Sequence, residues 1–155
     1  MVMEQEEFFP QKQLKKDIDY VDLCTLEDFQ SGSGGKKDWS FSDLEKDKYI
    51  CYRTGYTNEY HKDLGPVFPG VQNKETGKWL PCKIYESDIN YPIFFIMVEG
   101  KTKKLLMHKI VAQCFLVNDQ PELKKTVDHR NRLKSDWSLD NLLWDSQKNN
   151  SKNKG

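Results

Sequence analysis

The residues best suited to chemistry lie near the C-terminal end of the sequence, between Thr126 and Asn150. Asp128 and His129 are adjacent, Asn141 follows twelve residues after the histidine, and Asn150 nine residues later. Carboxylate and carboxamide oxygens are ligands that Mg²⁺ prefers, with water and substrate phosphate in its other positions. A histidine with a pKa of about 6.5 is largely neutral at physiological pH and can take a proton from water. The segment therefore has the groups for metal-assisted attack on a phosphate.

The two ends of this segment are apolar and β-prone, and read TVDH and NLLW. A charged loop separates them, so the pattern predicts two short antiparallel strands joined by an ordered loop. A short polar helix should follow, with Asp145 or Ser146 as its N-cap. Strict alternation along the first strand points Asp128 and His129 to opposite faces, so we expect that strand to twist or end there.

These residues resemble the motif of the HNH nucleases, also called ββα-metal or His-Me finger endonucleases, and especially their phage, viral and intron homing members. The likeness rests on VDH, the loop, LDNL with Trp144, and Asn150, and it extends upstream to LLMHKIVAQCFL. The resemblance implies that Asp128 and Asn150 are metal ligands and that His129 is the general base. It also implies that Asn141 ties the loop and holds the histidine in place.

The loop departs from a common pattern of that family. Where many members have Gly-Asn after the DH pair and Asn-Asn later, this chain has Arg132-Leu133 and Asp136-Trp137. The difference bears on the conformation of the loop and on some DNA contacts. The four core positions are retained.

The charge of the chain is unevenly distributed although its formal net charge is zero. Residues 1–50 have 7 Lys and Arg against 12 Asp and Glu, net −5, whereas residues 101–155 have 12 against 6, net +6. A basic surface around a phosphodiester site attracts nucleic acid, although charged runs also occur as plain solvated surface. The predicted nucleic-acid contacts are Arg130, Arg132, Lys134, Lys148 and Lys152.

Length and composition limit the class of protein. The 155 residues are 37% hydrophobic with a mean hydropathy of −0.81, which predicts one domain with a modest core. No apolar run approaches about 18 residues, and the acidic start is unlike a signal peptide. We therefore expect a soluble intracellular protein without a membrane partner, in the cytoplasm or nucleus of a host, with phage, virus or intron origin open. The four cysteines form no CxxC pair and are expected to be free or packed thiols.

The predicted fold class is α+β, with short antiparallel strands followed by a C-terminal ββα-metal finger. The expected divisions are residues 1–35, an acidic segment with some helix and a Ser/Gly linker; 36–100, a β-rich recognition or scaffold region; and 101–155, the motif region. Trp39 to Lys48 is expected to form a short helix capped at Ser40 or Ser42.

The β-rich region contains the runs YICYR, VFPGVQ, KWLPCKIY and IFFIMVE, which predict short strands. The last of them should form a hairpin with KTKKLLM across Glu99 to Lys101, and His108 to Leu116 should be helical. His108 is assigned to packing or capping rather than to a metal, and His61 to the surface. The aromatic residues either fill a thin core or stack on bases.

Three readings of function remain at this stage. The first is a DNA endonuclease that uses Mg²⁺, Mn²⁺ or another divalent cation, with His129 activating water and double-stranded DNA as the partner. The second is an HNH-fold nucleic-acid-binding or assembly module without chemistry, and the third is an unrelated α+β domain. We also expect a homodimer through the N-terminal half, or an acidic N-terminus that shields the basic face.

Overall fold

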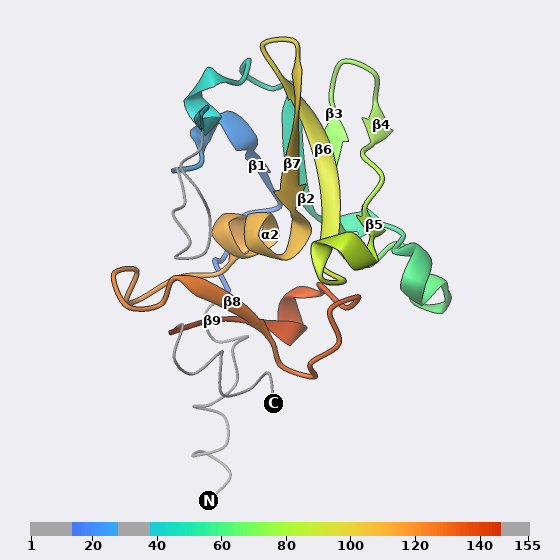
Figure 1. Cartoon of the computed structure of the whole chain (residues 1–155), viewed down its shortest axis with the longest axis vertical. Coiled ribbons are helices and arrows are strands. Elements are labelled where there is room, and N and C mark those ends of the chain that lie inside the picture. Colours follow the sequence, from blue (N-terminus) through green and yellow to red (C-terminus); the bar gives the residue numbers. More distant parts are fainter. Residues whose placement is uncertain (1–13, 28–37, 147–155) are drawn as a thin grey trace, which may run out of the picture.

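The computed structural model describes residues 14–27 and 38–146, and these form an α+β fold with antiparallel strands and one α-helix among them. In Figure 1 the longer strands stand side by side, helix α2 crosses beneath them, and strands β8 and β9 lie below the helix. The strands are β1 (Tyr20–Asp22), β2 (Tyr49–Tyr56), β3 (Phe68–Asn73), β4 (Lys78–Trp79), β5 (Lys83–Ile84), β6 (Pro92–Val98), β7 (Lys101–Leu106), β8 (Thr126–His129) and β9 (Leu142–Asp145); the helix is α2 (Met107–Phe115).

The strands form three antiparallel sheets, ordered β1-β2-β3-β4, β5-β6-β7 and β8-β9. Three of the predicted runs become strands β2, β3 and β6, whereas KWLPCKIY divides into the two short strands β4 and β5, which belong to different sheets. The hairpin predicted across Glu99 to Lys101 is confirmed, because Val98 pairs with Lys101. Its two loop residues, Glu99 and Gly100, have φ of 50° and 80°, which suits a tight turn that follows the twist of the strands.

Helix α2 connects the sheets to the β8–β9 hairpin. It contacts β2, β3, β6 and β7 on one side and β8 and β9 on the other. The predicted apolar residues Ile110, Val111, Cys114 and Phe115 are all buried. They share one core with the inward side chains of β2 and β6, including Cys51. The helix is therefore the layer that holds the C-terminal hairpin against the body of the protein.

Some predictions for the N-terminal half are wrong in detail. Trp39 to Lys48 contains only a three-residue 3-10 helix at Phe41–Asp43, where Ser40 N donates to the Asp43 carboxylate over 2.9 Å. Of the acidic N-terminal segment, residues 14–27 form strand β1 and a 3-10 helix at Leu23–Thr25. Strand β1 gains order by pairing with β2, and the 3-10 helices are only three residues long.

Two further expectations can be compared with the described residues. All four cysteines are free; Cys51, Cys82 and Cys114 are buried and the half-buried Cys24 packs against the core, so the predicted packing role holds for all four. None of the helices in residues 14–27 and 38–146 is long and apolar enough to cross a membrane. The helix expected after the motif falls within residues 147–155, outside the described residues.

Candidate active site

The site is built on the hairpin of β8 and β9, as predicted. His129 pairs with Leu142, Asp128 with Leu143 and Val127 with Trp144. The strand ends at His129. This was expected, because strict alternation along a strand points Asp128 and His129 to opposite faces. Alternation nevertheless persists along the strand, because Asp128 is half-buried while His129 is only 5% exposed. The two side chains thus leave the backbone toward different environments.

The ring of His129 packs against the rings of His108 and Tyr91. Its ring centre is 4.9 Å from that of His108 and 6.3 Å from that of Tyr91, and the rings of Tyr91 and His108 are stacked at 4.8 Å. His108 opens helix α2 and is 2% exposed, so its predicted packing role is confirmed. The contact with His129 was not predicted. Nδ1 of His108 and Nε2 of His129 are both buried without a hydrogen-bond partner.

Burial keeps both histidines neutral. It lowers the pKa of His129 to about 4, since the imidazolium loses solvation there; Asp136 opposes this shift and Lys134 adds to it. The pKa of His108 is held well below its ordinary value, mainly by burial and also by His129, Lys109 and Lys134. A neutral His129 is in the protonation state that a general base requires.

Asn141 ties the loop between the strands, as the resemblance implied. Its Oδ1 accepts from Asn131 N over 3.0 Å, and its Nδ2 donates to Asn131 Oδ1 and Asp136 O, each over 2.8 Å. Its backbone carbonyl accepts from Arg130 N over 2.7 Å. The side chain is 7% exposed, so water competes little for these bonds. Asn141 thereby fixes the backbone that follows His129.

The same loop is anchored to the first sheet by residues that sequence reasoning did not assign to the site. Trp137 is fully buried, its Nε1 donates to Pro69 O over 3.0 Å, and its ring packs edge-on against Phe68. Asn58 Nδ2 donates to Ser135 O over 2.8 Å. Trp137, a departure from the family pattern, is therefore a structural anchor of the loop.

His61 takes part in this anchoring and is not the surface residue that was predicted. It is half-buried, stacks on Phe68 at 5.8 Å and shares a hydrogen bond of 3.0 Å with Ser135 Oγ. The polar neighbours of His61 in the sequence gave no sign of these contacts, because both partners come from other elements of the chain.

Tyr91 packs beside the two histidines, and Lys134 lies over its ring. Lys134 Nζ donates to Ile89 O over 2.7 Å and lies 4.3 Å from the centre of the Tyr91 ring. Burial raises the pKa of Tyr91, and the charge of Asp128 raises it further, which places that carboxylate near the ring. Ile89 and Asn90 both have a positive φ, so the turn before Tyr91 is tightly bent.

The predicted nucleic-acid contacts fall into three groups. Arg130 and Arg132 are exposed on the loop, while Lys134 is half-buried and engaged as described. Lys148 and Lys152 lie outside the described residues. Several other lysines of the basic third form ion pairs, which reduces the charge they offer to a polyanion: Lys103 with Asp38, Lys104 with Asp88 and Lys124 with Asp119.

Arg132 has a φ of 62°, in the left-handed region that favours glycine. Its N–H donates to His129 O over 2.9 Å, which closes the turn directly after the base. The pattern that the motif resembles has glycine at this place, and the backbone here has the bend that glycine adopts most readily.

The residues at the end of strand β8 are compatible with the binding of a divalent cation. Asp128, the first predicted ligand, has a half-buried carboxylate next to His129 in the sequence, and Mg²⁺ needs few protein ligands. Asn150, the second predicted ligand, lies outside the described residues. Within residues 14–27 and 38–146, no group of three or more His, Cys, Asp or Glu side chains could hold a metal by itself. The donor set thus fits Mg²⁺ bound jointly with substrate phosphate, not a closed structural metal site.

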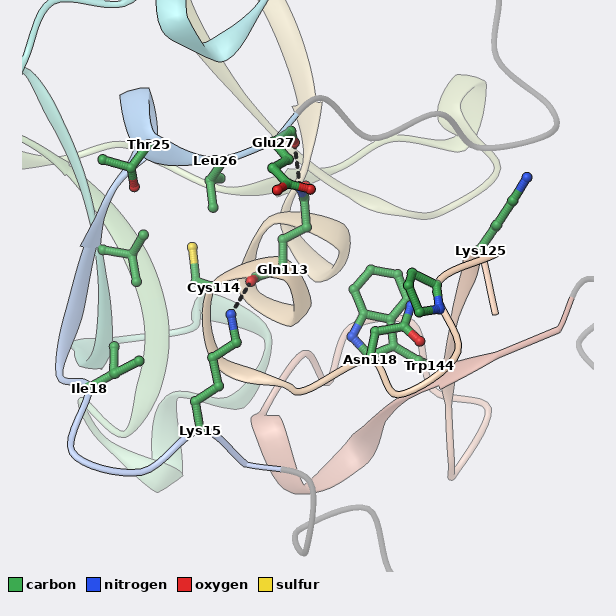
Figure 2. Close-up of a pocket in the computed structure, with 12 residues that line it drawn as sticks. Lys15, Ile18, Thr25, Leu26, Glu27, Gln113, Cys114, Asn118, Lys125 and Trp144 are labelled. Atoms are coloured by element: carbon green, nitrogen blue, oxygen red, sulfur yellow. Dashed lines mark hydrogen bonds between the residues drawn. The ribbon is translucent and has the colours of Figure 1, made fainter. Parts of the chain in front are cut away.

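A cavity of about 720 Å³ lies elsewhere, between the N-terminal segment, the end of α2 and Trp144. Figure 2 shows Lys15 donating to the Gln113 carbonyl across its floor, and the Gln113 side chain donating to Glu27 O. None of its described lining residues is among the predicted catalytic or metal-binding residues. The chemistry is therefore expected at the hairpin and not in this cavity.

Comparison with known proteins gives one relevant likeness. No family model matches the chain, and no curated protein matches it. Among solved structures, the chain is similar to the HNH homing endonuclease I-HmuI, in a structure that describes DNA binding and cleavage by that enzyme. The TM-score is 0.53 at 26% sequence identity, over 70% of this chain. The chain spans about half, 52%, of the length of that protein. The described fold is thus HNH-like.

Proposed function

We propose that this protein is a metal-dependent DNA endonuclease of the HNH type that hydrolyses phosphodiester bonds. The observation that carries the proposal is the neutral His129 at the end of β8, beside Asp128 and on a backbone fixed by Asn141. The likeness to a homing endonuclease that cleaves DNA supports the same activity.

In the proposed reaction, His129 accepts a proton from a water molecule while the water oxygen attacks phosphorus. The new P–O bond forms as the bond to the 3′ oxygen breaks, and the leaving oxygen takes a proton from solvent. Asp128 and Asn150 are the residues proposed to hold Mg²⁺ or Mn²⁺. When bound, the cation supplies positive charge that stabilises the phosphorane-like oxygens and the leaving group.

The substrate is proposed to be double-stranded DNA. Arg130 and Arg132 stand next to the base on an exposed loop, where they can reach backbone phosphates. The β-rich region is the proposed reader of sequence. Strands β6 and β7 there have an outward face with Phe95, Met97 and Lys104, in which Phe95 pairs with Lys104.

Supercoiled plasmid with Mg²⁺, with and without EDTA, tests the activity. We expect nicking that EDTA abolishes, and a loss of about 10²-fold or more in rate for His129→Ala, with DNA binding retained. Asp128→Asn should weaken the response to Mg²⁺, whereas Asp140→Asn, an exposed carboxylate of the same hairpin, is the matched control. Cleavage at the wild-type rate by His129→Ala would remove the assignment of the base.

The alternative is a binding or assembly module that keeps the fold without chemistry. The observation in its favour is that His129 is only 5% exposed, so water must reach a ring that the protein largely covers. Absence of cleavage with Mg²⁺, Mn²⁺ and other divalent cations, together with retained DNA binding, would select this alternative. The proposed dimer gains no support from residues 14–27, because they pack against their own chain.

A further inference from the structure

His108 is a polar ring where the core would accept an apolar one. It is 2% exposed at the start of α2, it packs against both Tyr91 and His129, and its Nδ1 has no partner. An unpaired buried nitrogen costs stability, and a phenylalanine ring could fill similar space without that cost. The nitrogen therefore calls for a role beyond packing.

The neighbouring ring of His129 also has a nitrogen without a hydrogen-bond partner. This nitrogen is the buried Nε2, the two ring centres are 4.9 Å apart and their planes are inclined by 45°. A neutral imidazole has one N–H donor and one acceptor nitrogen, so two neutral rings can satisfy each other. The torsion that turns an imidazole is broad, and a small rotation changes which ring edges face one another. Bonds to a catalytic base are often long before substrate binds.

We infer that His108 is the positioning residue of His129: its Nδ1 accepts a hydrogen bond from Nε2–H of His129. This inference rests on the proposed function. The bond fixes the tautomer of the base, so that Nδ1 of His129 has the lone pair that takes the proton from water. When His129 gains that proton, its Nε2–H bond to His108 becomes charge-assisted and stronger.

The surroundings favour this arrangement over a packing role alone. The ring of Tyr91 stacks on His108 at 4.8 Å and lies 6.3 Å from that of His129, so the three rings form one compact cluster, and Lys134 lies over Tyr91. Helix α2 packs on β6, β8 and β9, so His108 is held by rigid elements. A base whose second nitrogen has a fixed acceptor keeps its orientation through the reaction.

The first test reads the tautomer and needs no activity. Long-range proton–nitrogen NMR of the full chain at neutral pH reports which nitrogen of His129 bears hydrogen, with assignment from His129→Gln. We expect the Nε2–H form in the wild type and a loss of that preference in His108→Phe. A His129 that bears hydrogen on Nδ1, or a tautomer unchanged by His108→Phe, would overturn the inference.

The second test separates positioning from packing. In plasmid cleavage, His108→Phe should lower kcat by about 10-fold or more. KM for DNA should not rise, and the thermal midpoint of unfolding should not fall. His108→Asn, whose Oδ1 can accept, should recover part of kcat. Wild-type kcat in His108→Phe would overturn the inference. If the wild-type protein cleaves nothing, the proposed function fails, while the tautomer result still decides the hydrogen bond. Should His108→Phe not fold, His108→Leu, which also lacks an acceptor, provides both readings.

Discussion

At the scale of single residues, the backbone of Arg132 is at odds with its side chain. A φ of 62° is a strained conformation that destabilises the folded state for an L-residue but not for glycine. Glycine, however, loses more conformational entropy on folding. The two effects nearly offset each other. The contribution of Arg132 to the stability of the fold is therefore expected to be small.

Arg132→Gly should therefore separate stability from DNA affinity. We expect the free energy of unfolding to stay within about 1 kcal/mol of the wild type. The slope of log K against log[salt] on duplex DNA should become shallower by about 0.9, the effect of one lost phosphate contact. Urea unfolding and fluorescence anisotropy titrations at several salt concentrations measure the two quantities. An unchanged salt slope would mean that Arg132 does not contact phosphate.

The buried histidines make a second prediction at this scale, for the metal-free protein. Burial lowers the pKa of His108 strongly and that of His129 to about 4, whereas the unfolded residues titrate at about 6.5. Below about pH 6.5 the unfolded chain binds more protons, so the free energy of unfolding falls with pH and stops falling below the folded pKa values.

We expect each of these histidines to remove about 1–2 kcal/mol of stability between about pH 6.5 and 5. Urea unfolding at a series of pH values measures the total. The variant His108→Phe isolates one contribution, because its dependence on pH should be shallower than that of the wild type. Parallel curves for the two proteins would show that His108 is not held neutral by the fold.

At the scale of elements, the loop between β8 and β9 is ordered by one buried carboxamide. Asn141→Ala removes the acceptor for Asn131 N and the donor to Asp136 O. The expected loss is about 1–3 kcal/mol, because Asn131 N and Asp136 O lose their partners in a partly buried loop. Urea unfolding measures it, and Asn118→Ala, which loses one side-chain bond to Lys124 O, is the comparison. Equal losses for the two variants would contradict the central place of Asn141.

Local sequence patterns predicted this hairpin well. They did not predict the tertiary contacts around it. The ends of β8 and β9 follow from apolar, β-prone runs around a polar loop, and the β6–β7 turn follows from Glu99-Gly100 between two such runs. Tyr91, His108 and His129 come from separate elements, and their contact depends on how α2 packs. No periodicity encodes it. His108 lies within the upstream segment that carried the resemblance, and that was the one available signal for it.

At the scale of the whole molecule, the N-terminal segment belongs to the structure that supports the site. Strand β1 pairs with β2, Leu14 forms a bridge with Leu116 directly after α2, and Lys15 Nζ donates to Gln113 O over 3.2 Å. The first expectation was that this acidic segment dimerises or shields the basic face. The contacts of residues 14–27 with β2 and α2 predict, in addition, that this part of the segment stabilises the fold.

A form starting at Lys36 should accordingly unfold at lower urea than the full chain and should not cleave DNA faster. It loses β1 and leaves one edge of β2 unpaired. Its m-value should also fall, since less surface is buried. Sedimentation of both forms measures association. Faster cutting by a shorter form of equal stability would restore the shielding hypothesis.

The amine of Lys134 already has protein partners, namely the carbonyl of Ile89 and the ring of Tyr91. A phosphate that draws this amine away must therefore exchange one set of contacts for another, so its net gain is smaller than for an exposed arginine. The exchange also works in reverse. Because binding and order are linked reciprocally, DNA that engages Lys134 loosens the turn before Tyr91, and a mutation that loosens this turn makes the lysine more available to DNA.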